Sequence, residues 1–118
     1  MSKLGIAYVG CGCMARSFHM PAVAILQEHL AFVAFCDRNP EAAEQAAALY
    51  GGKAYSDLGQ MLAKEPGIDI VAVTVHAQHH HTVALQAADA GKHVIVEKPI
   101  AITAPCANAM IEACKTTA

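Results

Sequence analysis

Short apolar runs recur along the chain and alternate with longer segments in which apolar residues have helical spacing. An apolar run without polar alternation, bounded by glycine or polar residues, is typical of a strand that is buried on both faces. Such runs predict strands at Leu4–Val9, Leu30–Cys36, Asp69–Val75 and Lys92–Glu97, and a shorter run predicts one at Lys53–Tyr55.

The segments between these runs predict helices. One helix is expected over Pro40–Tyr50, because Asn39 is suited to cap its start and Gly51-Gly52 to end it. Proline at position 21 is expected to kink the first predicted helix, over residues 14–28, or to start a new turn there. The remaining helices are predicted over residues 14–28, from residue 56 or 57 to 64, over 79–90 and over 103–115.

Strands that alternate with helices through short connections indicate a parallel sheet covered on both faces. We therefore predict an α/β fold, a doubly wound (Rossmann) parallel sheet of about five to six strands with helices on both faces. Ligands of such sheets bind outside the carboxyl ends of the strands. The loops after Val9, Cys36, Val75 and Glu97 are accordingly expected to face one site.

The 118 residues (12.3 kDa) suit one domain, which we expect to span residues 1–118. A hydrophobic fraction of 55% and a charged fraction of 15% exclude a disordered or fibrous chain. A net charge of −2 without a basic run argues against a nucleic acid or an anionic membrane as partner. No apolar stretch approaches bilayer length and no signal peptide is evident, so we expect a cytoplasmic protein whose five cysteines are free thiols.

The first predicted strand is followed by Gly10-x-Gly12-x-x-Ala15, a pattern typical of dinucleotide-binding turns. Gly10 permits the tight turn, Gly12 lets a diphosphate approach the backbone, and Ala15 allows close packing of helix on strand. The start of the next helix, at Cys13 and Met14, is expected to offer amide groups to the pyrophosphate. The alternative is a glycine-rich turn that serves only to reverse the chain.

Asp37 ends the second predicted strand, where a dinucleotide-binding fold places the acceptor of the adenosine ribose hydroxyls. A carboxylate there would repel the 2′-phosphate of NADP by ~4 kcal/mol for charges about 4 Å apart at an effective dielectric of about 20. Arg38 could offset this repulsion or stack on the adenine. We therefore expect NAD as the cofactor, with NADP as the alternative. In the competing interpretation Asp37 only precedes the helix cap.

A third motif, AGKHVIVEKP at residues 90–99, ends a predicted strand with Glu97-Lys98-Pro99 and brings an ammonium group to the expected cleft. Together with GCGCMA at residues 10–15, CDRNPE at 36–41 and ALQAADAGKHVIVEKPIA at 84–101, it resembles the Gfo/Idh/MocA oxidoreductase family over essentially the whole chain. The resemblance implies an N-terminal nicotinamide-dinucleotide domain of an enzyme that exchanges hydride with a sugar, an inositol or a related polyol.

The resemblance also implies roles for single residues. Lys98 corresponds to the active-site lysine of the family, which hydrogen-bonds the reacting hydroxyl and assists proton movement. Glu97 would help to hold Lys98 and the nicotinamide ribose, and Pro99 would fix the turn. His80 matches the histidine of the family's Thr-Pro-Asn-x-x-His loop beside the cofactor. That loop otherwise departs from the family at residues 75–77, which read Val-His-Ala and leave its backbone path open.

A second departure concerns length, since family enzymes continue into a further strand and a C-terminal substrate domain. We therefore expect this chain to be a dinucleotide domain without that substrate domain, to bind cofactor with little or no turnover, and to self-associate through uncovered apolar faces. A non-catalytic binding or assembly module remains an alternative. A methyltransferase using S-adenosylmethionine is a third, in which Glu97-Lys98-Pro99 would have no role.

Four histidines, at positions 76, 79, 80 and 81, raise the question of a metal site. His76 and His80 have the i,i+4 spacing of a shared ligand pair, but a third ligand is not evident, and Cys11-x-Cys13 is too short for a zinc knuckle. We predict no metal and expect the histidines to be solvated at the start of a helix. A thiolate at Cys11 or Cys13, beside a helix N-terminus, would allow oxidation to block cofactor binding.

Overall fold

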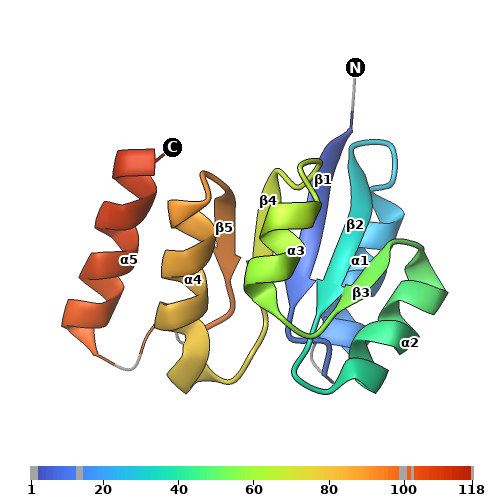
Figure 1. The fold of residues 1–118 in the computed structure, drawn as a ribbon, viewed down its shortest axis with the longest axis horizontal. Helices are drawn as coiled ribbons and strands as arrows, with labels where there is room; N and C mark the ends of the chain where they lie inside the picture. The colour runs from blue at the N-terminus through green and yellow to red at the C-terminus, as the bar shows by residue number, and fades with distance from the viewer. Residues whose placement is uncertain (1–2, 13–14, 99–100, 102, 118) are drawn as a thin grey trace.

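A computed structural model describes residues 3–12, 15–98, 101 and 103–117. Within these residues one parallel sheet of five strands has the order β3-β2-β1-β4-β5 (Figure 1). This confirms the predicted doubly wound α/β fold. The strands are β1 (Leu4–Val9), β2 (Leu30–Cys36), β3 (Lys53–Tyr55), β4 (Ile70–Val73) and β5 (His93–Val96).

The helices lie on both faces of this sheet, with α3 in front of it and α1 behind it in Figure 1. The helix over Pro40–Tyr50 has the predicted bounds, and the side chain of Asn39 caps it by accepting the Glu41 N–H at 3.1 Å. The described helical segments are η1 (Ala15–His19, a π-helix), α1 (Met20–Ile25), α2 (Pro40–Tyr50), α3 (Leu58–Lys64), η2 (Ala77–His79, a 3-10 helix), α4 (His80–Asp89) and α5 (Ala104–Thr117).

Two hydrophobic cores, one on each face, hold the helices to the sheet. Alternate residues of β1 point to opposite faces, as in any strand. Ile6 and Tyr8 belong to the core under α1 and α2. Ala7 and Val9 belong to the core under α3 and α4. Because β1 is buried from both sides, its sequence is a continuous apolar run.

The first predicted helix differs from the structure. Where one helix over residues 14–28 was expected, the described chain forms η1 and then α1, which ends at Ile25. Pro21 lacks an N–H and stands in the first turn of α1, where no helical donor is required, so a new turn starts there. The Leu26 N–H then bonds to the Val23 carbonyl at 2.9 Å and turns the chain toward β2.

The predicted strand over Asp69–Val75 is shorter in the structure, because β4 ends at Val73. The hydroxyl of Thr74 donates to the Gly10 carbonyl oxygen at 2.5 Å and draws the chain toward the loop after β1. This contact ties the loops of the two central strands together at the carboxyl edge of the sheet.

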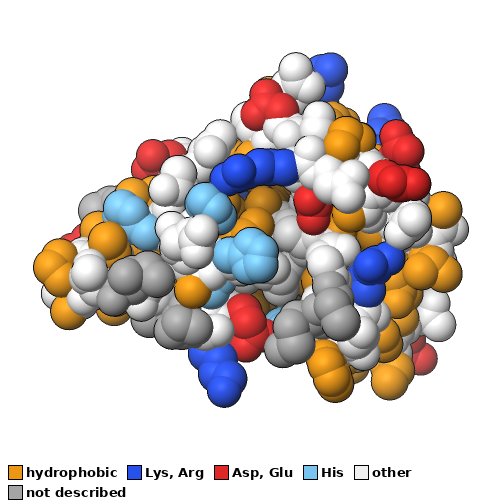
Figure 2. All heavy atoms as spheres, turned by 90° about the horizontal axis from the view of Figure 1, so that it is seen from below, with side chains coloured by type: hydrophobic (Ala, Val, Ile, Leu, Met, Phe, Trp, Pro, Cys, Tyr) orange, Lys and Arg blue, Asp and Glu red, His pale blue; other side chains and the backbone are white. Residues whose placement is uncertain are grey.

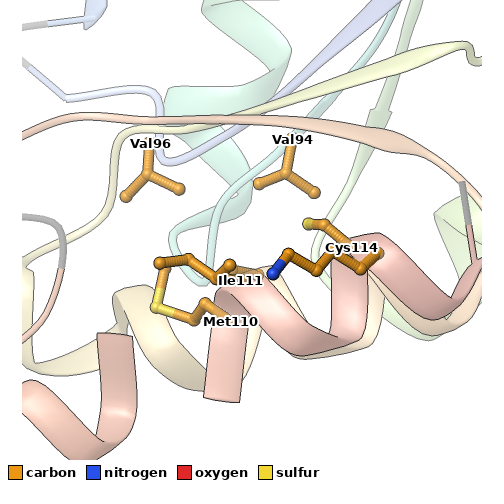
Figure 3. A pocket seen from close by; sticks show the side chains of 7 residues that line it. Val94, Val96, Met110, Ile111 and Cys114 are labelled. Atoms are coloured by element: carbon orange, nitrogen blue, oxygen red, sulfur yellow. The ribbon is translucent and has the colours of Figure 1, made fainter. Parts of the chain in front are cut away.

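The last helix, α5, packs against α4 beyond the end of the sheet. An apolar hollow of about 440 Å³ lies between β5, α4 and α5. Figure 3 shows Val94 and Val96 of β5 facing Met110 and Cys114 of α5 across this hollow. In the described residues β5 pairs only with β4, so its other edge is unpaired.

Candidate functional site

The strand order reverses between β1 and β4, and the loops at their carboxyl ends diverge there. A crevice of about 760 Å³ opens at this point, within the usual size range of ligand pockets. Figure 2 looks onto this edge and shows histidine and acidic side chains gathered around a central hollow. The predicted site residues that the structure describes all line the crevice: Gly10, Gly12, Asp37, Arg38, His80, Glu97 and Lys98.

The glycine turn has a different geometry at each of its two glycines. Gly10 has φ +100°, and a Cβ there would lie 2.6 Å from the backbone of Thr74 and Val75. Its N–H also donates to the Cys36 carbonyl at 2.8 Å, so the turn is fixed against both neighbouring strands. At Gly12, a Cβ would meet no other atom of the described residues within 4 Å. Gly12 therefore presents open backbone to the crevice.

The small residue of the turn, Ala15, is 1% exposed and lies in the core under α1. The Arg16 N–H donates to the Gly12 carbonyl at 3.0 Å and begins the helical path. Cys13 and Met14, predicted to offer amides to a pyrophosphate, lie outside the described residues, and that prediction stays open.

The Asp37 carboxylate is held in place by backbone donors. Oδ2 accepts the Cys11 N–H at 2.8 Å, and Oδ1 accepts the Asn39 N–H at 2.9 Å. One bond comes from the glycine turn and the other from the start of α2. The carboxylate thus links the glycine turn after β1 to the start of α2, and it is half-buried at the crevice wall.

Arg38 and His79 meet at the mouth of the crevice. Arg38 Nη2 lies 3.2 Å from His79 Nε2, and because a guanidinium can only donate, His79 Nε2 is the acceptor. The two residues follow β2 and β4, so this contact spans the carboxyl edge above β1. Stacking of Arg38 on an adenine remains a prediction.

Glu97 directly follows β5, and both oxygens of its carboxylate accept hydrogen bonds. Oε1 accepts the Lys98 N–H at 3.0 Å, and Oε2 accepts from Nε2 of His19. The bond from His19, followed by that from the Lys98 N–H, lowers the pKa of Glu97 below its usual value. Lys98 itself is exposed and lines the crevice.

His19 joins the site without any signal in the sequence. It stands in η1 between Phe18 and Met20, where no local pattern sets it apart from a surface histidine. Only the folded chain brings it to Glu97, 78 residues later.

His80 corrects the expectation that all four histidines of the loop are solvated. Its side chain is only 1% exposed, and Nε2 donates to the Val75 carbonyl at 2.9 Å. This bond closes the loop between β4 and α4. The backbone at His76 has φ −60° and ψ 148°, which is the polyproline conformation that proline itself favours. A proline at position 76 would therefore fit the observed backbone.

Cys11 does not meet the condition for the oxidation considered above. Burial, followed by the nearby Asp37 carboxylate, raises the pKa of the Cys11 thiol to about 12, which disfavours a thiolate there. Cys13 lies outside the described residues. The four described cysteines are free, as predicted: Cys11, Cys36, Cys106 and Cys114.

The described residues hold neither a cluster of metal ligands nor a membrane-spanning helix. No three His, Cys, Asp or Glu side chains in this part of the chain are grouped as metal ligands. No described helix has the length and apolar character needed to span a bilayer.

Comparisons with known proteins agree with this geometry. The family described as an oxidoreductase family with an NAD-binding Rossmann fold, Gfo/Idh/MocA, matches residues 4–118. Levoglucosan dehydrogenase of Pseudarthrobacter phenanthrenivorans is 30% identical over 98% of this chain. D-apiose dehydrogenase of Paraburkholderia graminis is 34% identical over 92% of the chain. This chain covers 31% and 28% of these two relatives, respectively.

Among solved structures, the WlbA dehydrogenase of Bordetella pertussis, in complex with NADH and UDP-GlcNAcA, superposes with a TM-score of 0.92. It is 33% identical, and the match covers 98% of this chain and 35% of that one. The glycine turn, the Asp37 loop and the Glu97-Lys98 loop of this chain all lie within the residues that the family matches. The chain belongs to the Gfo/Idh/MocA oxidoreductase family and comprises its NAD-binding Rossmann fold.

Proposed function

We propose that the crevice binds NAD in preference to NADP and that the chain forms the cofactor-binding part of a dehydrogenase acting on a sugar, an inositol or a related polyol. The observation that carries the proposal is the convergence of open backbone at Gly12, a carboxylate at Asp37 and an ammonium at Lys98 on one crevice. The dehydrogenase names of the two relatives support the substrate class.

The described residues fit a dinucleotide. Gly12 leaves room for a diphosphate against the backbone, because no side chain and no neighbouring atom of the described residues fills that space. The Asp37 carboxylate, already oriented by two backbone donors, suits the adenosine ribose hydroxyls. The loop closed by His80 would border the cofactor on the β4 side. When bound, nicotinamide supplies the hydride donor or acceptor.

The residues after β5, Glu97 and Lys98, would act at the nicotinamide end of the cofactor, where the substrate reacts. Lys98 would hydrogen-bond the substrate hydroxyl or carbonyl and carry a proton at Nζ. Glu97 would orient Lys98 through its bond to the Lys98 N–H. Lys98 is therefore the proposed catalytic residue of the described chain.

The proposal extends to the setting of the protein. We place it in the cytoplasm, where free thiols are stable, and we expect the chain to self-associate through exposed apolar side chains near β5 and α5.

Titration of the chain with NADH and NADPH, followed by calorimetry, tests this function. We expect NADH to bind more tightly than NADPH. Asp37→Ala should weaken NADH binding about tenfold, because a charge-assisted hydrogen bond is lost. Asp37→Asn keeps an acceptor for the Cys11 N–H and should mainly reduce the preference over NADPH.

Asp89→Ala, at the exposed end of α4, is the matched control and should leave both affinities unchanged. Absence of binding to either dinucleotide would overturn the proposed function. Tighter binding of NADPH would overturn only the role given to Asp37.

A further inference from the structure

The hydrogen bond between His19 and Glu97 joins the segments that follow β1 and β5, two strands that are not neighbours in the sheet. His19 ends η1, the helical segment after the glycine turn, and Glu97 follows β5. Strand β4 lies between β1 and β5, so the bond passes across the carboxyl end of β4. It therefore connects the phosphate-binding side of the crevice with the loop that carries Lys98.

Both partners of this bond are held in place. The His19 ring packs edge-on against Tyr8, with ring centroids 6.4 Å apart, and Tyr8 is 1% exposed in the core. The Glu97 N–H donates to the Val73 carbonyl at 3.1 Å and fixes the backbone of its loop. The side chains of His19 and Glu97 are 26% and 25% exposed. A bond between two anchored and partly buried groups restricts motion more than a surface ion pair does.

The chemistry of the pair fixes which atom donates. The pKa of Glu97 is lowered, so its carboxylate is ionised near neutral pH and can only accept. His19 Nε2 therefore carries the proton of the bond. The charged and titratable groups that face Glu97 are His19 from η1 and Lys98 from its own loop, and Tyr8 of β1 faces His19.

We propose that His19 is a positioning residue, which holds Glu97 and through it the backbone of Lys98 in the place that receives the nicotinamide end of the cofactor. The relay has two steps, from His19 Nε2 to Glu97 Oε2 and from Glu97 Oε1 to the Lys98 N–H. Because Glu97 lines the crevice while His19 reaches it from the η1 side, His19 acts without being a catalytic residue. This inference rests on the proposed function.

The test compares NADH with ADP, which shares the adenosine and diphosphate but lacks the nicotinamide and its ribose. His19→Leu removes the donor and keeps an apolar side chain against Tyr8. We expect this variant to bind NADH about tenfold more weakly and ADP as tightly as the wild type does. His19→Gln, whose amide N–H can donate to Glu97, should recover most of the NADH affinity. His29→Leu, an exposed histidine in the turn before β2, is the matched control and should change neither affinity.

A second readout follows the bond itself. In His19→Leu, the pKa of the Glu97 carboxyl, measured by carbon NMR titration, should rise toward its ordinary value because its principal donor is gone. Equal loss of NADH and ADP affinity, or an unchanged pKa of Glu97, would overturn the inference and leave the proposed function standing. A wild-type chain that binds neither ligand would overturn both.

Discussion

At the scale of single residues, Gly10 and Gly12 show that one motif joins two separate requirements. Gly10 has a left-handed φ and lies against the Thr74 backbone, so its lack of a side chain serves the fold. Gly12 has no such contact among the described residues, and its lack of a side chain serves the crevice. A pattern read from the sequence alone cannot separate these requirements, because both positions read as glycine.

Alanine substitutions should separate the two glycines. Gly10→Ala should lower the free energy of unfolding by about 2–4 kcal/mol, through backbone strain and a steric overlap with the backbone of Thr74 and Val75. Gly12→Ala should leave the thermal midpoint within about 2 °C of the wild type and weaken NADH binding at least tenfold, since the methyl group occupies the place of the diphosphate. Calorimetric unfolding and NADH titration check both expectations. A large loss of stability in Gly12→Ala would contradict the open geometry at that position.

The buried thiols beside Asp37 make stability depend on pH. Burial raises the pKa of Cys11 to about 12 and that of Cys36 to about 11, from an ordinary value of 9.0 in the unfolded chain. Above pH 9.0 the unfolded state therefore binds fewer protons than the folded state, so the free energy of unfolding falls as the pH rises. Between about pH 8 and pH 10.5 we expect a loss of about 1–2 kcal/mol per thiol.

Urea unfolding at both pH values measures this loss. Cys11→Ala should reduce the slope of stability against pH, whereas Cys106→Ala, on α5, should keep the slope of the wild type. Equal slopes in the wild type and Cys11→Ala would mean that folding does not raise the pKa of the Cys11 thiol.

At the scale of elements, local chemistry made some segments predictable. The helix α2 has a side-chain cap at Asn39, a proline at its first residue and glycines at its end, and its bounds match the prediction. The strands β1, β2 and β3 also match, because continuous apolar runs or flanking glycines mark their ends. Where start and stop signals are encoded within a few residues, the sequence suffices.

Other elements depend on contacts between distant residues and could not be predicted. The end of β4 is set by the bond from Thr74 to Gly10, 64 residues away. His80 was expected to be exposed, yet the fold buries it behind Val75. The bond from His19 to Glu97 has no local signal at either residue. The sequence motifs predicted which loops line the crevice, but the contacts that join these loops are visible only in the folded structure.

At the scale of the whole molecule, the crevice arises from topology. Loops from β1, β2, β4 and β5 reach one edge because all strands are parallel and the order reverses between β1 and β4. The same sheet leaves β5 as an edge strand in the described residues. In the described residues β3 is the edge strand at the other end, and the helices α4 and α5 lie beside the β5 end.

The unpaired edge of β5 should make the chain self-associate. On β5, Ile95 is 49% exposed, and one edge of this strand pairs with no other strand of the described residues. On α5, Ile111 is 46% exposed near the apolar hollow (Figure 3). Such an edge can pair with that of a second copy, because the same strand offers both donors and acceptors. Light scattering after gel filtration should show a mean mass that increases with concentration, and Ile95→Lys should reduce that increase. Leu49→Lys serves as the control, because it also replaces an exposed apolar side chain by lysine but lies on α2, away from β5. If both lysine variants associate as the wild type does, association does not depend on the β5 edge.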